Sequence, residues 1–126
     1  ITQVINNLVD NAIKFAPQQN GKLDIVVSYS DGDNKEKFDG NVIVSVKDNG
    51  TGIDPEIMPK LFSKFATKSF SGTGLGLYVS KNIIEAHGGK IWAENNNGNG
   101  ATFYFSLPVS GLTYISYNEM GDRNYI

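Results

Sequence analysis

Apolar residues recur along this chain with two different periods. From Ile1 to Ala16 they follow the spacing of an amphipathic helix, and Pro17 marks its end. The same spacing returns from Leu75 to Ala86, where Gly88-Gly89 supplies the stop signal. The pattern therefore predicts a helix at the beginning of the chain and another in its second half.

Alternation of apolar and polar residues predicts two pairs of strands. The stretches Lys22–Ser30 and Val42–Val46 are rich in β-branched residues, and the polar segment 31–40 between them is typical of a solvated loop. The stretches Lys90–Glu94 and Ala101–Leu107 flank a run of asparagines and glycines, which tolerate positive φ. We expect this second pair to form a hairpin.

Three further segments carry weaker patterns. Asp54-Pro55 offers a helix N-cap followed by proline at the first helical position, so a short helix is expected through Leu61. Residues 63–73 have no sustained period and end in Ser-Gly-Thr-Gly, which is typical of a mobile loop. Beyond Pro108 the pattern fades, and Leu112–Tyr117 is compatible with either one more strand or a disordered tail.

The order of these elements points to one domain. At 126 residues, of which 40% are hydrophobic, the chain is long enough for one packed core and too short for two. A helix, a strand pair, a short helix, a loop, a helix and a strand pair follow each other without internal repeats. This order predicts an α/β (α+β) two-layer sandwich, with a mixed, mostly antiparallel sheet and helices on one face.

Charge and composition exclude several classes of function. The formal net charge is −2, so the overall balance favours neither nucleic acid nor direct contact with an anionic membrane. The chain has no cysteine, which rules out a disulfide framework, a thiolate metal site and a cysteine nucleophile. No apolar run is long enough to cross a bilayer. We expect a cytoplasmic domain, and composition leaves open whether its parent is anchored in a membrane.

A polar stripe runs along the first predicted helix. Its members are Gln3, Asn7, Asp10, Asn11 and Lys14. Most such stripes are solvated faces, but asparagine is a poor helix former compared with the glutamate, lysine or glutamine usual on exposed faces. Neutral amide oxygens suit a Mg²⁺ ion that also binds substrate phosphates, and Asn11 is a candidate ligand.

Asp48 stands at the end of a predicted strand, within Lys47-Asp48-Asn49-Gly50-Thr51-Gly52-Ile53. Two interpretations are open. A tight turn without a ligand explains the glycines. Base recognition explains the acid as well, because a carboxylate accepts a hydrogen bond from the amino group of adenine, and a pocket built to pair that group rejects bases without it.

The segment Gly72-Thr73-Gly74-Leu75-Gly76-Leu77 lies where a loop becomes a helix. Unpaired amides and the helix dipole at such a position favour a phosphate group. The Lys-Ser/Thr ending of a Walker loop is absent, and no strand directly precedes the segment as in the dinucleotide fingerprint. A phosphate site is the prediction, with Lys68 as a candidate point charge, although a single loop lysine is usually just solvated.

The remaining residues with chemical potential favour structural roles. Phe62 and Phe65 would share one face if the short helix extended through them, and core packing or loop anchoring is the simplest interpretation. His87 is the only histidine of the sequence and falls in a last helical turn, where the dipole favours it. A serine or cysteine hydrolase site finds no support, because no nucleophile elbow or thiol accompanies this histidine.

Taken in chain order, these motifs resemble the successive boxes of the catalytic, ATP-binding domain of sensor histidine kinases. The boxes are Asn7-Leu8-Val9-Asp10-Asn11-Ala12-Ile13-Lys14-Phe15, Asp48-Asn49-Gly50-Thr51-Gly52-Ile53, Leu61-Phe62-Ser63-Lys64-Phe65, Gly72 to Leu77, and Gly98-Asn99-Gly100-Ala101-Thr102-Phe103. The resemblance covers residues 1–108 and leaves 109–126 as a C-terminal tail. It implies the Bergerat ATP-binding fold, shared with DNA gyrase, the heat-shock chaperone ATPases and the mismatch-repair MutL proteins.

The resemblance also implies a site for ATP and Mg²⁺. Asn11 would hold the metal, and with Asn7 and Lys14 it would form the catalytic set near the phosphates. Asp48 would recognise the adenine amino group, helped by Thr102 through a hydroxyl or a bridging water. The residues implied to contact the nucleotide are Asn11, Lys14, Phe15, Asp48, Gly50, Gly52, Ile53, Lys68, Thr73, Gly74, Leu75, Gly76, Leu77 and Thr102.

Several of these residues would have distinct tasks. Gly50 and Gly52 would clear room for the nucleotide, and Ile53 would line its apolar side. Residues 63–73 would form a lid over the triphosphate, with Lys68 reaching the γ-phosphate.

One position distinguishes the kinases from their hydrolysing relatives. Gyrase-like members carry a water-activating glutamate one helical turn before the magnesium asparagine, where this sequence has Asn7, and a neutral amide is a poor general base. The resemblance therefore implies transfer of the ATP γ-phosphoryl group to a histidine on a separate dimerisation domain, with a response regulator downstream. A Bergerat-type ATPase clamp and a non-catalytic regulatory module that binds nucleotide are the alternatives.

The chain also departs from the family pattern. The phosphoacceptor histidine with its dimerisation helices is absent, and so is the strand expected before the first helix. The resemblance therefore implies an N-terminally truncated domain from a longer protein, with one sheet edge that Leu112–Tyr117 could occupy. Phe15 stands where tyrosine is common.

Overall fold

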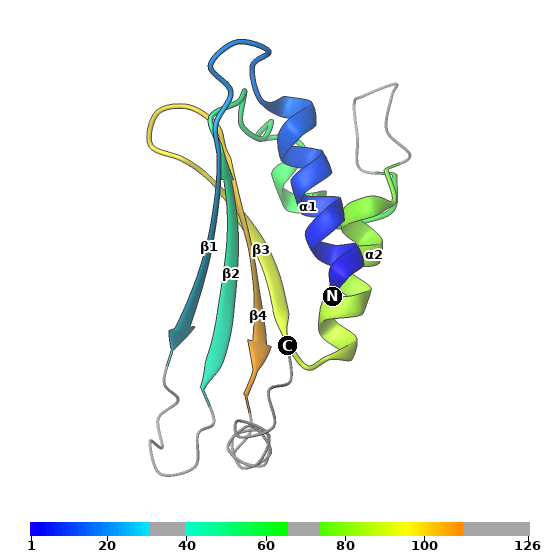
Figure 1. The fold of residues 1–126 in the computed structure, drawn as a ribbon. Helices are drawn as coiled ribbons and strands as arrows, with labels where there is room; N and C mark the ends of the chain where they lie inside the picture. The colour runs from blue at the N-terminus through cyan, green and yellow to red at the C-terminus, as the bar shows by residue number, and fades with distance from the viewer. Residues whose placement is uncertain (31–39, 66–73, 110–126) are drawn as a thin grey trace.

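The computed structural model describes residues 1–30, 40–65 and 74–109, and its elements follow the predicted order (Figure 1). The elements are α1 (Thr2–Phe15), β1 (Leu23–Ser30), β2 (Asn41–Asp48), the 3₁₀ turn η1 (Met58–Lys60), α2 (Gly76–Ala86), β3 (Lys90–Asn95) and β4 (Ala101–Pro108). Residues 31–39, 66–73 and 110–126 lie outside this description, and with them the predicted strand at Leu112–Tyr117.

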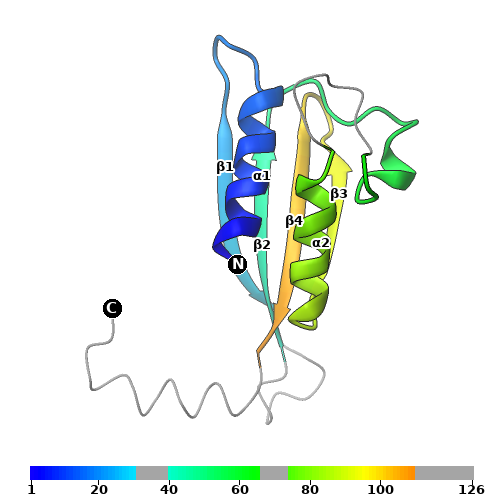
Figure 2. The ribbon, with the colours of Figure 1, turned by 90° about the vertical axis from the view of Figure 1, so that its right-hand side faces the viewer.

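The strands form one sheet in the order β1-β2-β4-β3. All described pairings are antiparallel, and the hairpin partners β3 and β4 are joined by a turn in which Gly98 and Gly100 have φ of 112° and 88°. Both helices lie on the same face of the sheet (Figures 1 and 2). The predicted two-layer α/β sandwich is therefore confirmed.

The core lies between the helix layer and the inner face of the sheet. Its buried members come mainly from both layers, because the apolar stripe of each helix faces the alternate apolar positions of the strands. They are Val4, Leu8, Ala12, Val44, Val46, Leu61, Ile84, Ala101, Phe103 and Phe105. This packing holds α1 against β2, and α2 against β3 and β4.

Strand β1 is the exception to this burial. All its residues are exposed, including Ile25 at 50% and Val27 at 67%. These two side chains pair in register with Val46 and Val44 and therefore lie on the helix-facing side of the sheet. The helices contact the other strands instead, α1 on β2 and α2 on β3 and β4. The core is thus built on three strands, with an apolar edge beside it.

The prediction of a short helix from Asp54 through Leu61 is wrong. Only the 3₁₀ turn η1 forms there. Before it in the chain, the Asp54 carboxylate accepts a hydrogen bond from the backbone amide of Glu56 at 2.9 Å. Pro59 explains the difference, because proline cannot donate a backbone hydrogen bond and its ring clashes with the carbonyl one helical turn earlier.

No helix within the described ranges is long and apolar enough to cross a membrane.

Candidate functional site

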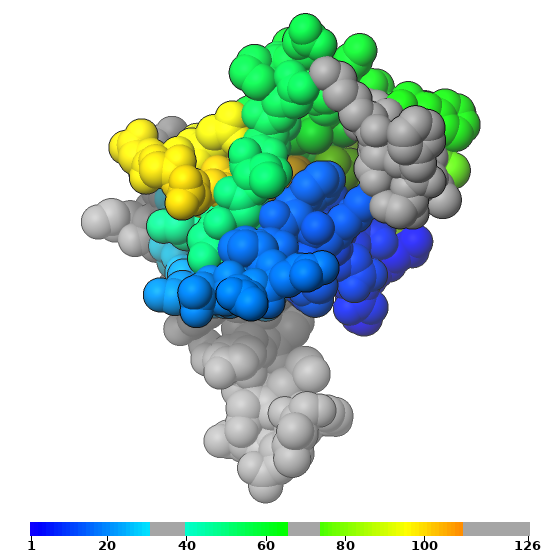
Figure 3. All heavy atoms as spheres, turned by 90° about the horizontal axis from the view of Figure 1, so that it is seen from above, coloured from blue at the N-terminus to red at the C-terminus, as the bar shows by residue number. Residues whose placement is uncertain are grey.

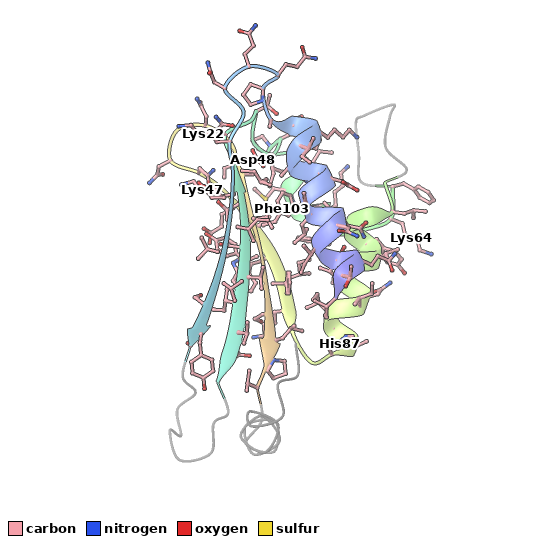
Figure 4. The ribbon with its side chains drawn as sticks, viewed as in Figure 1. Lys22, Lys47, Asp48, Lys64, His87 and Phe103 are labelled. Atoms are coloured by element: carbon pink, nitrogen blue, oxygen red, sulfur yellow. The ribbon has the colours of Figure 1, made fainter. Side chains whose placement is uncertain are left out.

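The motif residues converge at one end of the sandwich. Figure 4 shows Asp48 where β2 ends beside the C-terminal part of α1, whereas His87 lies at the opposite end of the molecule. Seen from that end, the segments after α1, after β2 and after β3 meet at the surface (Figure 3). The end that holds Asp48 is therefore the candidate site.

Asp48 is the buried acid of this site, with an exposed fraction of only 4%. Its Oδ1 accepts hydrogen bonds from the backbone amides of Gly50 at 2.9 Å and Ala101 at 3.3 Å. The other oxygen, Oδ2, makes no hydrogen bond or ion pair with the described residues. Since no fully buried polar side-chain atom in the described ranges lacks a partner, Oδ2 reaches the surface. One carboxylate oxygen is thus fixed, and the other is available to a donor.

The glycines after Asp48 are explained by contacts within the protein. A Cβ on Gly50 would collide with the backbone carbonyl of Phe15, at the end of α1. Gly52 has φ of 80°, and a Cβ there would meet Asn95 Oδ1 at 2.9 Å. We expected these glycines to clear room for a nucleotide, and the structure gives each of them a packing reason that needs no ligand.

Thr102 lies on the other face of the sheet from Asp48. It pairs in register with Lys47, and paired residues share a face while neighbours along a strand alternate. Its hydroxyl donates to Asn96 Oδ1 at 2.6 Å. The structure therefore does not bring the Thr102 hydroxyl to the Asp48 carboxylate, and the amide of Ala101 lies there instead.

Asparagine side chains brace this end of the sheet, and the sequence analysis missed them. Asn49 Oδ1 accepts from the amide of Lys22 at 2.8 Å, and Asn49 Nδ2 donates to the carbonyl of Asn20 at 2.9 Å. Asn95 and Asn96 make comparable bonds from the hairpin turn. The sequence shows these residues only as turn formers, because their partners are distant in the chain.

The first turn of α2 forms a second part of the site. Gly76 is exposed, and a Cβ there would meet nothing closer than Asn7 Cγ at 3.9 Å. The N-cap residue of this helix is Leu75, whose apolar side chain makes no capping hydrogen bond. Gly74 has φ of 71° and lies against Phe65, whose amide donates to its carbonyl at 2.8 Å. Among the described residues, Gly76 is therefore the glycine that neither a positive φ nor a close contact requires.

The polar stripe of α1 faces this turn. Asn7 Nδ2 donates to the carbonyl of Gly76 at 3.2 Å and to Ser80 Oγ at 3.1 Å. Asn11, one turn further along, is partly buried, and its side chain makes no hydrogen bond with the described residues. The Lys14 ammonium lies 5.5 Å from the centre of the Phe15 ring. Asn11 thus lies one turn after Asn7 on α1. This helix contacts Gly76 through Asn7, and its last residue, Phe15, lies against Gly50 in the segment that follows Asp48.

The other predicted site residues divide into placed and undescribed ones. Phe15 is 39% exposed at the end of α1, and Ile53 is partly buried against the core. Leu75 and Leu77 flank Gly76 and are also partly buried. Lys68 and Thr73 lie outside the described residues, so their predicted roles stay predictions.

The phenylalanines of the third box separate in the structure. Phe62 packs edge-on against Phe103, with 6.4 Å between ring centres, as core packing requires. Phe65 is 67% exposed and has φ of 59°. His87 is the C-cap residue of α2, as its place in the last helical turn predicts, and its Nδ1 lies 2.7 Å from the carbonyl oxygen of Ile83.

Known proteins match this chain over most of its length. The family described as histidine kinase-, DNA gyrase B- and HSP90-like ATPase matches residues 1–111. Sensor protein FixL of Bradyrhizobium diazoefficiens is 42% identical over 110 residues, which cover 87% of this chain and 21% of FixL. The chain spans 14% to 21% of the length of four such curated relatives.

Solved structures agree with this family. The catalytic domain of the histidine kinase ThkA superposes with a TM-score of 0.66 at 43% identity, covering 88% of this chain and 67% of that domain. ShkA, solved in complex with AMPPNP, gives a TM-score of 0.65 at 30% identity, covering 86% of this chain and 21% of ShkA. The chain therefore belongs to the histidine kinase-, DNA gyrase B- and HSP90-like ATPase family, as an ATP-binding catalytic domain of the sensor histidine kinase type.

Proposed function

We propose that this domain binds ATP between Asp48 and the first turn of α2 and donates the γ-phosphoryl group to a histidine on a separate dimerisation domain. The observation that carries the proposal is the Asp48 carboxylate, buried without an ion-pair partner among the described residues. Burial of such a group costs free energy. Its available Oδ2 is the acceptor that the amino group of adenine requires.

Gly76 supports a phosphate site at the other end of the nucleotide. Glycine in a helix costs about 1 kcal/mol relative to alanine, yet no contact with the described residues requires it at this position. A ligand that approaches the backbone closely explains the residue. Backbone amides at a helix start favour a phosphate group, and the triphosphate is the phosphate-bearing part of ATP.

Asn11 fits a magnesium ion shared with the phosphates. No cluster of three or more histidine, cysteine, aspartate or glutamate side chains in the described ranges could hold a metal by itself. Mg²⁺ commonly takes one or two protein oxygens and completes its octahedron with phosphates and water, so the amide oxygen of Asn11 would suffice. When bound, the ion would neutralise phosphate charge, and Lys14 would add a positive charge at the end of α1.

Asn7 favours phosphoryl transfer over hydrolysis. Its side-chain nitrogen is engaged by Gly76 and Ser80, so it holds the start of α2. An amide cannot take a proton from water as a general base does. What the site offers is position and charge, on which phosphoryl transfer mainly relies.

A reconstituted transfer reaction tests this function. The 126-residue chain is mixed with radiolabelled ATP, Mg²⁺ and a dimerisation domain that carries the phosphoacceptor histidine. We expect acid-labile, base-stable label on that histidine, and none when the histidine is replaced by alanine or Mg²⁺ is chelated.

The other outcomes separate the alternatives. Steady ATP hydrolysis without any histidine partner would support an ATPase clamp. Nucleotide binding with neither hydrolysis nor label would contradict the kinase function and support a regulatory module. Absence of nucleotide binding would overturn the assignment of the whole site.

A further inference from the structure

Two adjacent asparagines, Asn95 and Asn96, connect the β3–β4 turn to the segment that carries Asp48. They belong to none of the boxes that carry the family resemblance. Asn95 is the last residue of β3, and Asn96 opens the turn. From the end of the molecule that holds the site, this turn lies beside the segment that follows β2 (Figure 3).

The Asn95 side chain forms two hydrogen bonds with the backbone of Ile53. Its Oδ1 accepts from the amide of Ile53 at 2.7 Å, and its Nδ2 donates to the carbonyl of the same residue at 3.0 Å. Only an amide side chain presents a donor and an acceptor side by side in this way. Asn95 Oδ1 leaves no room for a Cβ on Gly52, so the Asn95 side chain also restricts the path of the chain before Ile53.

Asn96 holds the main chain of Asp48. Its Nδ2 donates to the carbonyl of Asp48 at 3.0 Å and to that of Asn99 at 3.2 Å. Its Oδ1 accepts from the Thr102 hydroxyl at 2.6 Å. Both amide ends are therefore committed, and their orientation is fixed because the two carbonyls can only accept. Asn96 thus ties the strand end that carries the carboxylate to the turn and to β4.

We propose that Asn95 and Asn96 are positioning residues of the base pocket, which hold its apolar side at Ile53 and its polar side at Asp48. The proposal rests on the proposed function, in which Asp48 accepts from the adenine amino group and Ile53 lines the ring. The two asparagines then have different effects. Asn96 sets the discrimination between bases, and Asn95 sets the affinity for any purine nucleotide.

The test compares ATP with inosine triphosphate, which carries a carbonyl oxygen where adenine carries its amino group. Affinities of the 126-residue chain are measured by calorimetry with Mg²⁺. Asn96→Ala should reduce the preference for ATP on the order of tenfold. Asn95→Ala should weaken both nucleotides by about the same factor, on the order of fivefold, and leave their ratio unchanged.

Asn97→Ala is the matched control, because Asn97 is exposed in the same turn and makes no side-chain hydrogen bond with the described residues. It should leave both affinities at the wild-type values. Loss of fold would weaken both nucleotides together, so a changed ratio in Asn96→Ala identifies positioning. For Asn95→Ala the ratio is silent, so its thermal unfolding is measured as well, and an unfolding temperature equal to that of the wild type assigns the weaker binding to positioning. If Asn96→Ala does not fold, Asn96→Ser, which keeps a polar group, takes its place.

The outcomes distinguish this inference from the function beneath it. A wild-type domain that binds no ATP, or binds both nucleotides equally, would contradict the role of Asp48 itself. A wild-type domain that prefers ATP, together with variants that keep its ratio and affinities, would overturn the positioning roles of Asn95 and Asn96.

Discussion

Around Asp48, backbone amides and asparagine side chains tie four segments of the chain together, whereas around Gly76 the first turn of α2 is held across the site by Asn7. The glycines differ in the same way. Gly50, Gly52 and Gly100 have no room for a side chain because protein atoms lie against them, and Gly76 has room. In the proposed function, the base side is therefore formed by the fold itself, and on the phosphate side the described residues leave room for a ligand. Substitutions should affect stability on one side and affinity on the other.

Gly100→Ala should have the largest effect and damage the base side. Gly100 has φ of 88°, and a Cβ would collide with the backbone carbonyl of Asp48. We expect a loss of about 3 kcal/mol in the free energy of unfolding, measured by urea denaturation. Gly98→Ala is the control, since Gly98 also has positive φ, 112°, but nothing lies within 4 Å of its Cβ position. It should cost only about 1 kcal/mol, and equal costs would mean that the contact with Asp48 is unimportant.

Asp48→Asn should affect the ligand more than the fold. The amide oxygen can still accept from Gly50 and Ala101, so the free energy of unfolding should change little. The second position becomes a donor that faces the donor of adenine, and a hydrogen bond to a charged group is lost. We expect ATP affinity to fall by about 2 kcal/mol in calorimetry. Asp24→Asn on the exposed strand β1 is the control, and unchanged ATP affinity in Asp48→Asn would remove Asp48 from base recognition.

Gly76→Ala should sharpen the comparison, because it separates affinity from stability. Alanine is the better helix former, so the free energy of unfolding should stay the same or rise by up to about 1 kcal/mol. The added methyl group would stand where the phosphates approach, and ATP affinity should fall about tenfold, or about 1.4 kcal/mol. Thermal unfolding and calorimetry on the same sample measure both. A variant that binds ATP as well as the wild type does would place the phosphates elsewhere.

Ser80→Ala should have the smallest effect. The buried Ser80 hydroxyl accepts one bond from Asn7, while the bond from Asn7 to Gly76 remains. We expect a loss of about 1 kcal/mol in the free energy of unfolding and a slight loss of ATP affinity. Ser28→Ala on β1 is the control, since Ser28 is exposed. A loss of ATP affinity larger than that of Gly76→Ala would show that the phosphate side also depends on the fold.

The fold was predictable wherever the pattern is local. Both helices and all four described strands follow from the spacing of apolar residues, and the hairpin follows from its asparagines and glycines. The segment from Asp54 to Leu61 departs from the prediction, because the cap signal at its start favours a helix that Pro59 then prevents. The exposure of β1 could not be predicted either, because the alternation of apolar and polar residues in a strand is the same whether or not a helix covers that strand.

The candidate site was predictable as a set of motifs but not as a geometry. Asp48 lies at the end of a strand and Gly76 at the start of a helix, as the motifs predict, and their roles toward a nucleotide stay predictions. Thr102 does not, because a shift of one residue along a strand moves a side chain to the other face. The partners of Asn95 and Ser80 could not be foreseen, because they lie 42 and 73 residues away in the chain.

The sheet order has a consequence for how this domain folds. Strand β2 pairs with β4, not with its successor β3, and Asn7 meets Gly76 and Ser80 across 69 and 73 residues. Such contacts need long loops to close before they return any free energy, which slows folding. Each side of the nucleotide site depends on one of these late contacts. The ability to bind nucleotide should therefore appear in the last step of refolding. Nucleotide added during refolding would bind only to molecules that have completed folding.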